Sequence, residues 1–153
     1  MLFRSNAYGL LQSEANTIAP GKTPLSAMTP TVITRDGKLL LVLGSPGGPT
    51  IINTVMNTIL NILEYKMGVQ QAVDAPRFHH QWMPDRLIME PGFSPDTLEL
   101  LRARGHQIEV RPAIGDCQAI AVDPKTGELL GAADPRLGGK AVEIGRASCR
   151  ERV

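Results

Sequence analysis

The most regular pattern along the chain is an apolar repeat that follows a glycine-rich turn. Between Ile51 and Met67 the apolar side chains recur at a spacing of 3.6 residues, and polar side chains occupy the remaining faces. Gly68 follows at the position where a helix C-terminus favours a glycine in the left-handed conformation. The pattern therefore predicts a helix over residues 51–67 that ends at Gly68.

Strand-like segments lie on both sides of this helix. Residues 31–35 and 38–43 are separated by Asp36-Gly37, a dipeptide typical of a two-residue hairpin turn. The apolar run Leu39–Leu43 suits a strand that is covered on both faces. The same criteria predict further strands over residues 86–90, 107–111, 117–122 and 128–132.

Two shorter helices complete the predicted elements. One covers residues 69–74, and the other begins after the N-cap Ser94, has Pro95 at its first position, and runs to Arg104 before Gly105. The strands thus form clusters instead of alternating regularly with helices. This order predicts an α+β fold with a largely antiparallel sheet.

Composition excludes several classes of protein. The 153 residues contain 16 Lys and Arg against 15 Asp and Glu, which gives a formal net charge of +1. Nucleic acids and anionic membranes require concentrated basic charge, so neither is an expected partner. The sequence has no apolar run of the roughly 18 residues that a membrane span needs. Its two cysteines are too few for a disulfide framework.

The two ends of the chain differ in composition from the rest. Leu2–Ser5 and the arginine-rich Glu143–Val153 both resemble translated sequencing-adapter sequence. We therefore expect residues 1–5 and 143–153 to be adapter-derived scars and residues 6–142 to form one partial domain. A basic tail that binds a partner is the alternative interpretation of the C-terminal segment.

The segment LVLGSPGGPTII is the main candidate for chemistry. Gly47 and Gly48 have no side chains to block their N–H groups, and they lie just before the start of a predicted helix. Such a turn can bind a phosphate, a carboxylate or the oxyanion of a tetrahedral intermediate. The same glycines also suit a tight turn with close packing, so the turn by itself leaves both interpretations open.

Other polar residues offer weaker candidates. Ser26, in a loop flanked by prolines, can bind a ligand carboxylate or simply satisfy a local turn. The adjacent His79 and His80 point to opposite sides of an extended segment, which suits a metal ion poorly. Cys117 is expected to pack as a small apolar strand residue. We therefore expect no metal site and find no nucleophile beside its base.

The order of several motifs over residues 8–142 resembles one enzyme family. The segments EANTIAPGKTPLSAMTPT, LVLGSPGG, AVDAPRFHHQW, GFSPDTL and GAADPR are similar to the C-terminal part of the small subunit of bacterial γ-glutamyltransferases. The resemblance implies an N-terminal-nucleophile (Ntn) hydrolase fold, which is a four-layer αββα sandwich. Two subunits of one autoprocessed precursor build that sandwich, so the large subunit is the implied protein partner.

The resemblance also implies an activity. Enzymes of this family transfer the γ-glutamyl group of glutathione to water or to amino-acid and peptide acceptors, without a metal or organic cofactor. The acyl-enzyme forms on an N-terminal Thr, which precedes the region matched here, so we expect this fragment to be inactive alone. Bacterial members are periplasmic or secreted, and the same location is expected for the full-length protein.

The resemblance assigns roles to four positions. Gly47 and Gly48 correspond to the oxyanion hole, and Ser26 and Ala27 to a pair of serines that bind the glutamyl α-carboxylate. Ala27 removes one hydroxyl contact to a charged group, a loss of about 1.5–3 kcal/mol. A cephalosporin acylase-like activity is therefore an alternative. A second alternative, from a different functional class, is a module that binds phosphate or another anion at the glycine turn.

Overall fold

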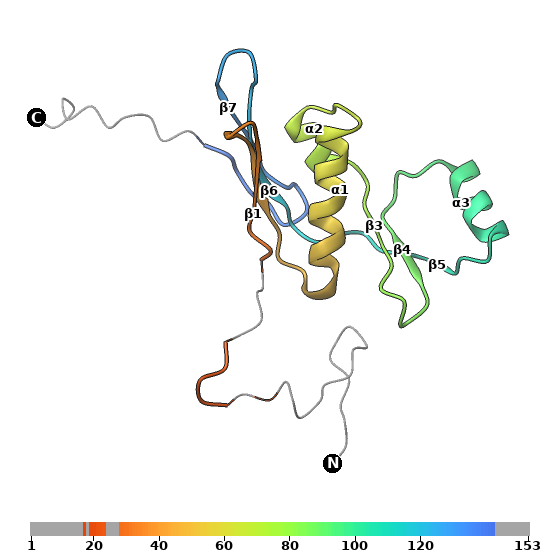
Figure 1. Cartoon of the computed structure of the whole chain (residues 1–153). Helices are drawn as coiled ribbons and strands as arrows, with labels where there is room; N and C mark the ends of the chain where they lie inside the picture. The colour runs from red at the N-terminus through yellow and green to blue at the C-terminus, as the bar shows by residue number, and fades with distance from the viewer. Residues whose placement is uncertain (1–16, 18, 24–27, 143–153) are drawn as a thin grey trace, which may run out of the picture.

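The computed structural model describes residues 17, 19–23 and 28–142, in two sheets and three helices (Figure 1). None of the described helices is long and apolar enough to cross a membrane. The order of elements is β1 (Thr31–Arg35), β2 (Lys38–Gly44), the 3₁₀ turn η2 (Gly48–Thr50), α1 (Ile51–Leu63), α2 (Val69–Asp74), β3 (Phe78–His79), β4 (Leu87–Met89), α3 (Pro95–Ala103), β5 (Ile108–Val110), β6 (Gln118–Val122) and β7 (Leu129–Ala132).

The larger sheet is antiparallel throughout, in the order β1-β2-β6-β7. The predicted hairpin is confirmed, since Arg35 pairs with Lys38 and both Asp36 and Gly37 have positive φ, as a type I′ turn requires. Within the described residues β2 is covered on one face, and not on both as predicted. Leu41 and Leu43 are buried while Val42 between them is only partly buried, because the described helices cover one face of the sheet.

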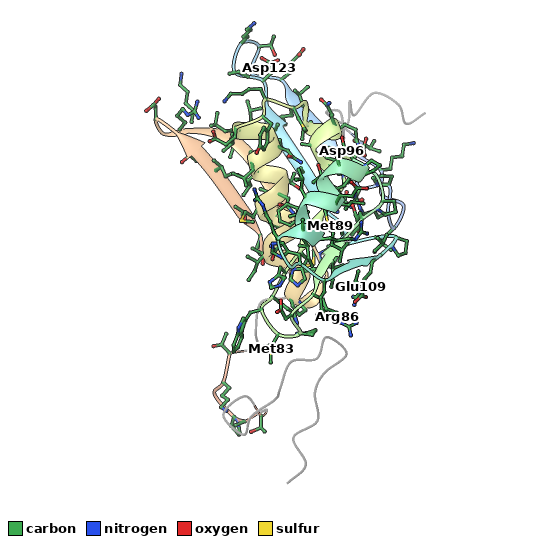
Figure 2. All side chains as sticks on the ribbon, turned by 90° about the vertical axis from the view of Figure 1, so that its right-hand side faces the viewer. Met83, Arg86, Met89, Asp96, Glu109 and Asp123 are labelled. Carbon is green, nitrogen blue, oxygen red and sulfur yellow. The ribbon has the colours of Figure 1, made fainter. Side chains whose placement is uncertain are left out.

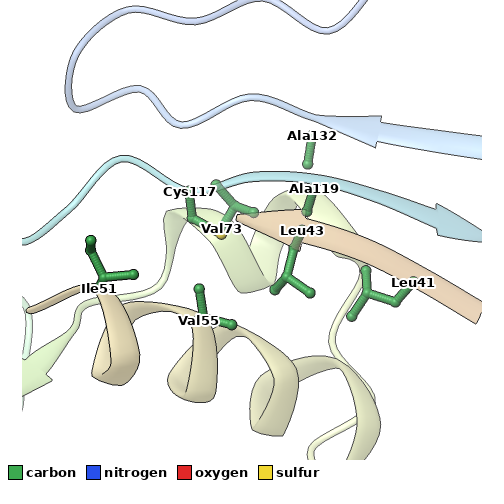
Figure 3. Packing of buried hydrophobic residues seen from close by; sticks show 8 residues of the cluster. All are labelled: Leu41, Leu43, Ile51, Val55, Val73, Cys117, Ala119 and Ala132. Atoms are coloured by element: carbon green, nitrogen blue, oxygen red, sulfur yellow. The ribbon is translucent and has the colours of Figure 1, made fainter. Parts of the chain in front are cut away.

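The hydrophobic core lies between this sheet and helices α1 and α2 (Figure 3). Its aliphatic side chains interdigitate across the two layers, and their removal from water is the main stabilising contribution. Cys117 is fully buried among them, which confirms its predicted role as a small apolar residue. The cluster consists of Leu41, Leu43, Ile51, Val55, Val73, Cys117, Ala119 and Ala132.

The predicted end of the first helix is wrong. Helix α1 ends at Leu63, and the left-handed residue is Lys66 (φ 58°) instead of Gly68. Gly68 has φ −59° and ψ 151° and starts α2, where its carbonyl accepts a hydrogen bond from the N–H of Ala72 at 2.9 Å. Gly68, in the short loop between the two helices, therefore forms the start of α2 and not the end of α1.

The second sheet differs from the expected single sheet. Strands β4 and β5, which cover two of the predicted segments, pair in parallel, and the short strand β3, which was not predicted, pairs antiparallel with β4. Helix α3 connects β4 to β5, as a parallel crossover requires. Its predicted cap is confirmed, because Ser94 Oγ accepts the N–H of Thr97 at 3.2 Å. Glu109, in β5, pairs with Arg86, which directly precedes β4 (Figure 2).

Candidate active site

The glycine turn connects strand β2 to helix α1. Gly47 has φ 139° and Gly48 has φ 59°, conformations that residues with a side chain rarely adopt. A Cβ atom on Gly47 would lie 2.7 Å from Thr50 Oγ1 and 3.4 Å from the Cα of Gly115. Both the backbone conformation and the space at position 47 therefore require glycine.

The N–H groups of the two glycines are free to bind a ligand. Within the described part of the chain, no residue accepts a hydrogen bond from either N–H. Gly48 is exposed and Gly47 is half-buried. The turn thus presents two adjacent backbone donors at the N-terminal end of α1, where the helix dipole also favours negative charge.

A second segment, residues 114–117, supports this turn from the protein interior. The N–H of Asp116 donates to Ser45 Oγ at 3.0 Å, and Ser45 is fully buried. Gly115 has φ 70°, and a Cβ atom there would lie 2.6 Å from Thr54 Oγ1 and 2.9 Å from Ser45 Oγ. The sequence analysis missed Gly115, whose only sequence signal was a glycine between two predicted strands.

A buried cluster of four charged side chains lies behind this segment. Arg77 Nη1 is 2.7 Å from Asp134 Oδ2, and Arg136 contacts both Asp134 (3.0 Å) and Glu90 (2.5 Å). Each of the four side chains is 10% exposed or less. Each ion therefore has an opposite charge beside it, as buried charges require. The sequence analysis assigned no role to any of the four.

The ionic cluster also binds the backbone of residues 114–117. Glu90 Oε1 accepts the N–H of Ile114 at 2.6 Å, and Arg77 Nη1 donates to the Ile114 carbonyl at 3.0 Å. Asp134 Oδ2 accepts the N–H of Cys117 at 2.7 Å. The cluster therefore holds both sides of Gly115, the residue that contacts the glycine turn.

Two groups near this segment have shifted pKa values. Burial by itself raises the pKa of Asp134. Hydrogen bonds from the backbone N–H groups of Arg136 and Cys117, together with the guanidinium groups of Arg136 and Arg77, lower this pKa below its ordinary value. Burial raises the pKa of the Cys117 thiol. The thiol is therefore protonated at neutral pH, which makes Cys117 a poor nucleophile.

The lowered pKa of Asp134 predicts acid sensitivity. The folded chain releases this proton at a lower pH than the unfolded chain does, so the carboxylate stabilises the fold above its unfolded pKa of about 4. That stabilisation is lost as the pH falls through the folded pKa. We expect Asp134→Asn to flatten the acid limb of stability below about pH 5. Urea unfolding at a series of pH values measures this pH dependence of stability. An acid limb that is the same in Asp134→Asn and in the unmodified chain would contradict the prediction.

The two histidines contact different partners. His79 is buried, with Nδ1 3.0 Å from Asn53 Oδ1 on α1 and Nε2 2.9 Å from Gln81 Oε1. His80 Nε2 lies 3.0 Å from Asp85 Oδ1 near the surface. These contacts point in different directions, as expected for adjacent residues of an extended segment. Among the residues that the structure describes, no three His, Cys, Asp or Glu side chains are grouped to hold a metal ion.

The predicted carboxylate-binding positions, Ser26 and Ala27, lie outside the described residues. Of the predicted site residues, the structure describes Gly47 and Gly48, and it brings them together with Ser45, Thr50 and the segment around Gly115.

Known proteins share the sequence and the fold of this chain. Residues 2–144 match the family Gamma-glutamyltranspeptidase. The chain is 53% identical over 131 residues to the glutathione hydrolase proenzyme of Escherichia coli, covering 86% of this chain and 22% of that protein. It is 46% identical over 138 residues to the glutathione hydrolase proenzyme of a Pseudomonas species, covering 90% and 22%. The chain thus spans about a fifth of the length of the curated relatives it matches.

A solved structure supports the same relationship. The crystal structure of a mutant γ-glutamyltranspeptidase of Helicobacter pylori superposes with a TM-score of 0.80 at 46% identity, covering 87% of this chain and 73% of that chain. The helical layer on an antiparallel sheet is therefore part of the Ntn-hydrolase fold that the motifs implied. With the family match extending over most of its length, the chain belongs to the γ-glutamyltranspeptidase family.

Proposed function

We propose that this chain is the C-terminal part of the small subunit of an enzyme that transfers γ-glutamyl groups from glutathione-type substrates. The acceptor is water, an amino acid or a peptide. The observation that carries the proposal is the pair of N–H donors at Gly47 and Gly48, for which the described residues supply no acceptor, in a chain that belongs to the γ-glutamyltranspeptidase family. The longer protein of which this chain is the proposed part is the full-length enzyme.

The glycine pair has a defined task in such a reaction. A hydroxyl nucleophile, the Thr that self-cleavage leaves at the N-terminus of the small subunit, attacks the carbonyl carbon of the γ-glutamyl amide while its α-amino group takes the hydroxyl proton. The carbonyl oxygen becomes negative, and the N–H groups of Gly47 and Gly48 stabilise it. The C–N bond then breaks and the amine leaves with the proton. The acceptor gives a proton to the α-amino group and attacks the acyl carbon, the ester bond to the Thr oxygen breaks, and that oxygen takes the proton back. Loss of one such donor in other enzymes costs about 10²–10³-fold in kcat.

Substrate recognition is proposed to involve Ser26. Its hydroxyl donates to the α-carboxylate of the glutamyl group, and Ala27 provides no second hydroxyl. Without a second hydroxyl contact to the α-carboxylate, the enzyme is expected to accept other acyl groups besides γ-glutamyl, as a cephalosporin acylase-like member would. A module that binds phosphate at the same turn would use the same donors, but membership of the γ-glutamyltranspeptidase family favours acyl transfer.

The exposed face of the larger sheet supports a large-subunit partner. Val32, Ile120 and Leu129 are 64%, 47% and 69% exposed, and the strand register places all three on the face opposite the one that packs on α1. Figure 1 shows α1 on one side of this sheet. An apolar sheet face of this kind is typical of a surface that another layer covers. We propose that a second sheet from the rest of the enzyme packs there and completes the αββα sandwich.

The activity is tested with a chromogenic γ-glutamyl anilide. The full-length enzyme is expected to release the aniline from the γ-glutamyl compound and much less from the α-glutamyl isomer. The 153-residue chain alone is expected to release none, because the proposed nucleophile lies outside it. A full-length enzyme that hydrolyses neither anilide, yet binds phosphate at the glycine turn, would overturn the proposal in favour of the anion-binding module.

A further inference from the structure

We propose that Ser45 and Thr50 are positioning residues that aim the two glycine N–H groups at the substrate. The inference rests on the proposed function, because it explains how the donors of the oxyanion hole obtain their direction. In a trans peptide group the C=O and N–H bonds point in opposite directions. The peptide groups before Gly47 and Gly48 are both trans. A side chain that holds either carbonyl therefore sets the direction of the N–H that follows it.

Thr50 holds the carbonyl that precedes the Gly48 N–H. The Gly47 oxygen accepts two hydrogen bonds from Thr50, one from its N–H at 3.2 Å and one from its hydroxyl at 2.9 Å. The Gly47 carbonyl thus points toward the first turn that leads into α1. The N–H of Gly48, on the other side of the same peptide plane, points away from that turn and stays free for a ligand.

Ser45 holds the other peptide group in the same way. Its hydroxyl donates to the Pro46 carbonyl at 2.7 Å and accepts the N–H of Asp116 at 3.0 Å. Because Ser45 is fully buried, the Pro46 carbonyl points toward the interior. The N–H of Gly47 consequently points in the opposite direction, away from the interior.

The two hydroxyl contacts act on successive peptide planes, so they aim two neighbouring donors. Catalysis by an oxyanion hole depends on donors that are already oriented when the charge develops, since reorienting them during the reaction would cost free energy. Neither hydroxyl is itself proposed to touch the substrate. Ser45 and Thr50 therefore act through the glycines, and their removal should affect the transition state more than substrate binding.

The test compares Ser45→Ala and Thr50→Val in the full-length enzyme, with kcat expressed per active site titrated by the acylation burst. We expect each change to lower kcat about tenfold and to leave KM within about twofold. Thr50→Ser keeps the hydroxyl and should retain the unmodified kcat. Thr58→Val is the matched control, because it removes a buried hydroxyl of α1 that donates to the Thr54 carbonyl at 3.0 Å, away from the turn.

A second measurement separates aiming from general support of the fold. The affinity of a γ-glutamyl boronate, which mimics the tetrahedral intermediate, should fall by the same factor as kcat/KM, whereas the affinity of glutamate should not change. If the unmodified enzyme is active and both variants keep their kcat, the inference is overturned and the proposed function stands. The inference is also overturned if Thr58→Val loses as much kcat as the two variants do, or if the variants bind glutamate and the boronate equally more weakly. An inactive unmodified enzyme would count against the proposed function itself.

Discussion

Gly47→Ala is expected to lower the kcat of the full-length enzyme by about 10²–10³-fold, whereas KM is expected to change by only a small factor. The added Cβ would lie 2.7 Å from Thr50 Oγ1, closer than such atoms can approach, and φ is 139° at this position. The turn must then shift and displace the Thr50 hydroxyl, so that the following N–H no longer points at the developing charge. Steady-state kinetics with a γ-glutamyl anilide measures the effect.

The matched control for this change is Gly37→Ala in the β1–β2 hairpin. Gly37 also has a positive φ, 74°, but nothing lies within 4 Å of the added Cβ. The variant therefore carries backbone strain without a steric contact and without any relation to the donors. It is expected to retain its kcat per folded molecule. If Gly37→Ala lost as much kcat as Gly47→Ala, strain in a turn and not the loss of a donor would explain both.

Glu90→Gln is expected to reduce the free energy of unfolding by about 3–5 kcal/mol. Glu90 is buried and accepts hydrogen bonds from the backbone N–H groups of Arg77 and Ile114 and from the side chain of Arg136. The amide keeps the shape but removes the charge that Arg136 faces, and its NH₂ group meets donors instead of acceptors. A loss of this size is a large share of the stability of an ordinary domain. Equilibrium unfolding in urea measures it.

Glu109→Gln provides a control with the same chemical change at the surface. Glu109 pairs with Arg111 at 2.7 Å and with Arg86 at 3.2 Å, and hydrogen bonds from these two arginines lower its pKa. Water screens such exposed ion pairs, so removing the charge of Glu109 should shift the unfolding midpoint far less than Glu90→Gln does. Equal shifts for the two variants would show that burial of the cluster adds nothing to its contribution.

Local signals in the sequence predicted local structure well. Asp36-Gly37 placed the hairpin correctly because a two-residue turn depends only on the conformations of its own residues. Ser94 and Pro95 likewise placed the start of α3. The prediction for Gly68 was wrong because a glycine between two helices can serve either one, and here it starts α2. Glycines at positions 47 and 48 were found because helix starts have a local signature.

Features that depend on residues far apart in the sequence were not predictable. The contact between Ser45 and Asp116 joins residues 71 positions apart, and no periodic pattern links them. The pairing of Arg77 with Asp134 is of the same kind, since ordinary surface arginines and aspartates look identical in a sequence. The parallel pairing of β4 with β5 also depended on how α3 crosses between them. Sequence alone therefore placed the glycine turn at the start of a helix but did not predict the residues that support it.

The hydroxyl contacts that orient the glycine peptides connect residues one and three positions apart. Contacts of such short range close quickly during folding, whereas the pairing of β2 with β6 must wait for a loop of more than seventy residues to close. The direction of the Gly48 N–H, which the Thr50 contact sets, is thus encoded at the entrance to α1. We expect it to arise with the first turn of that helix, before the sheet is assembled.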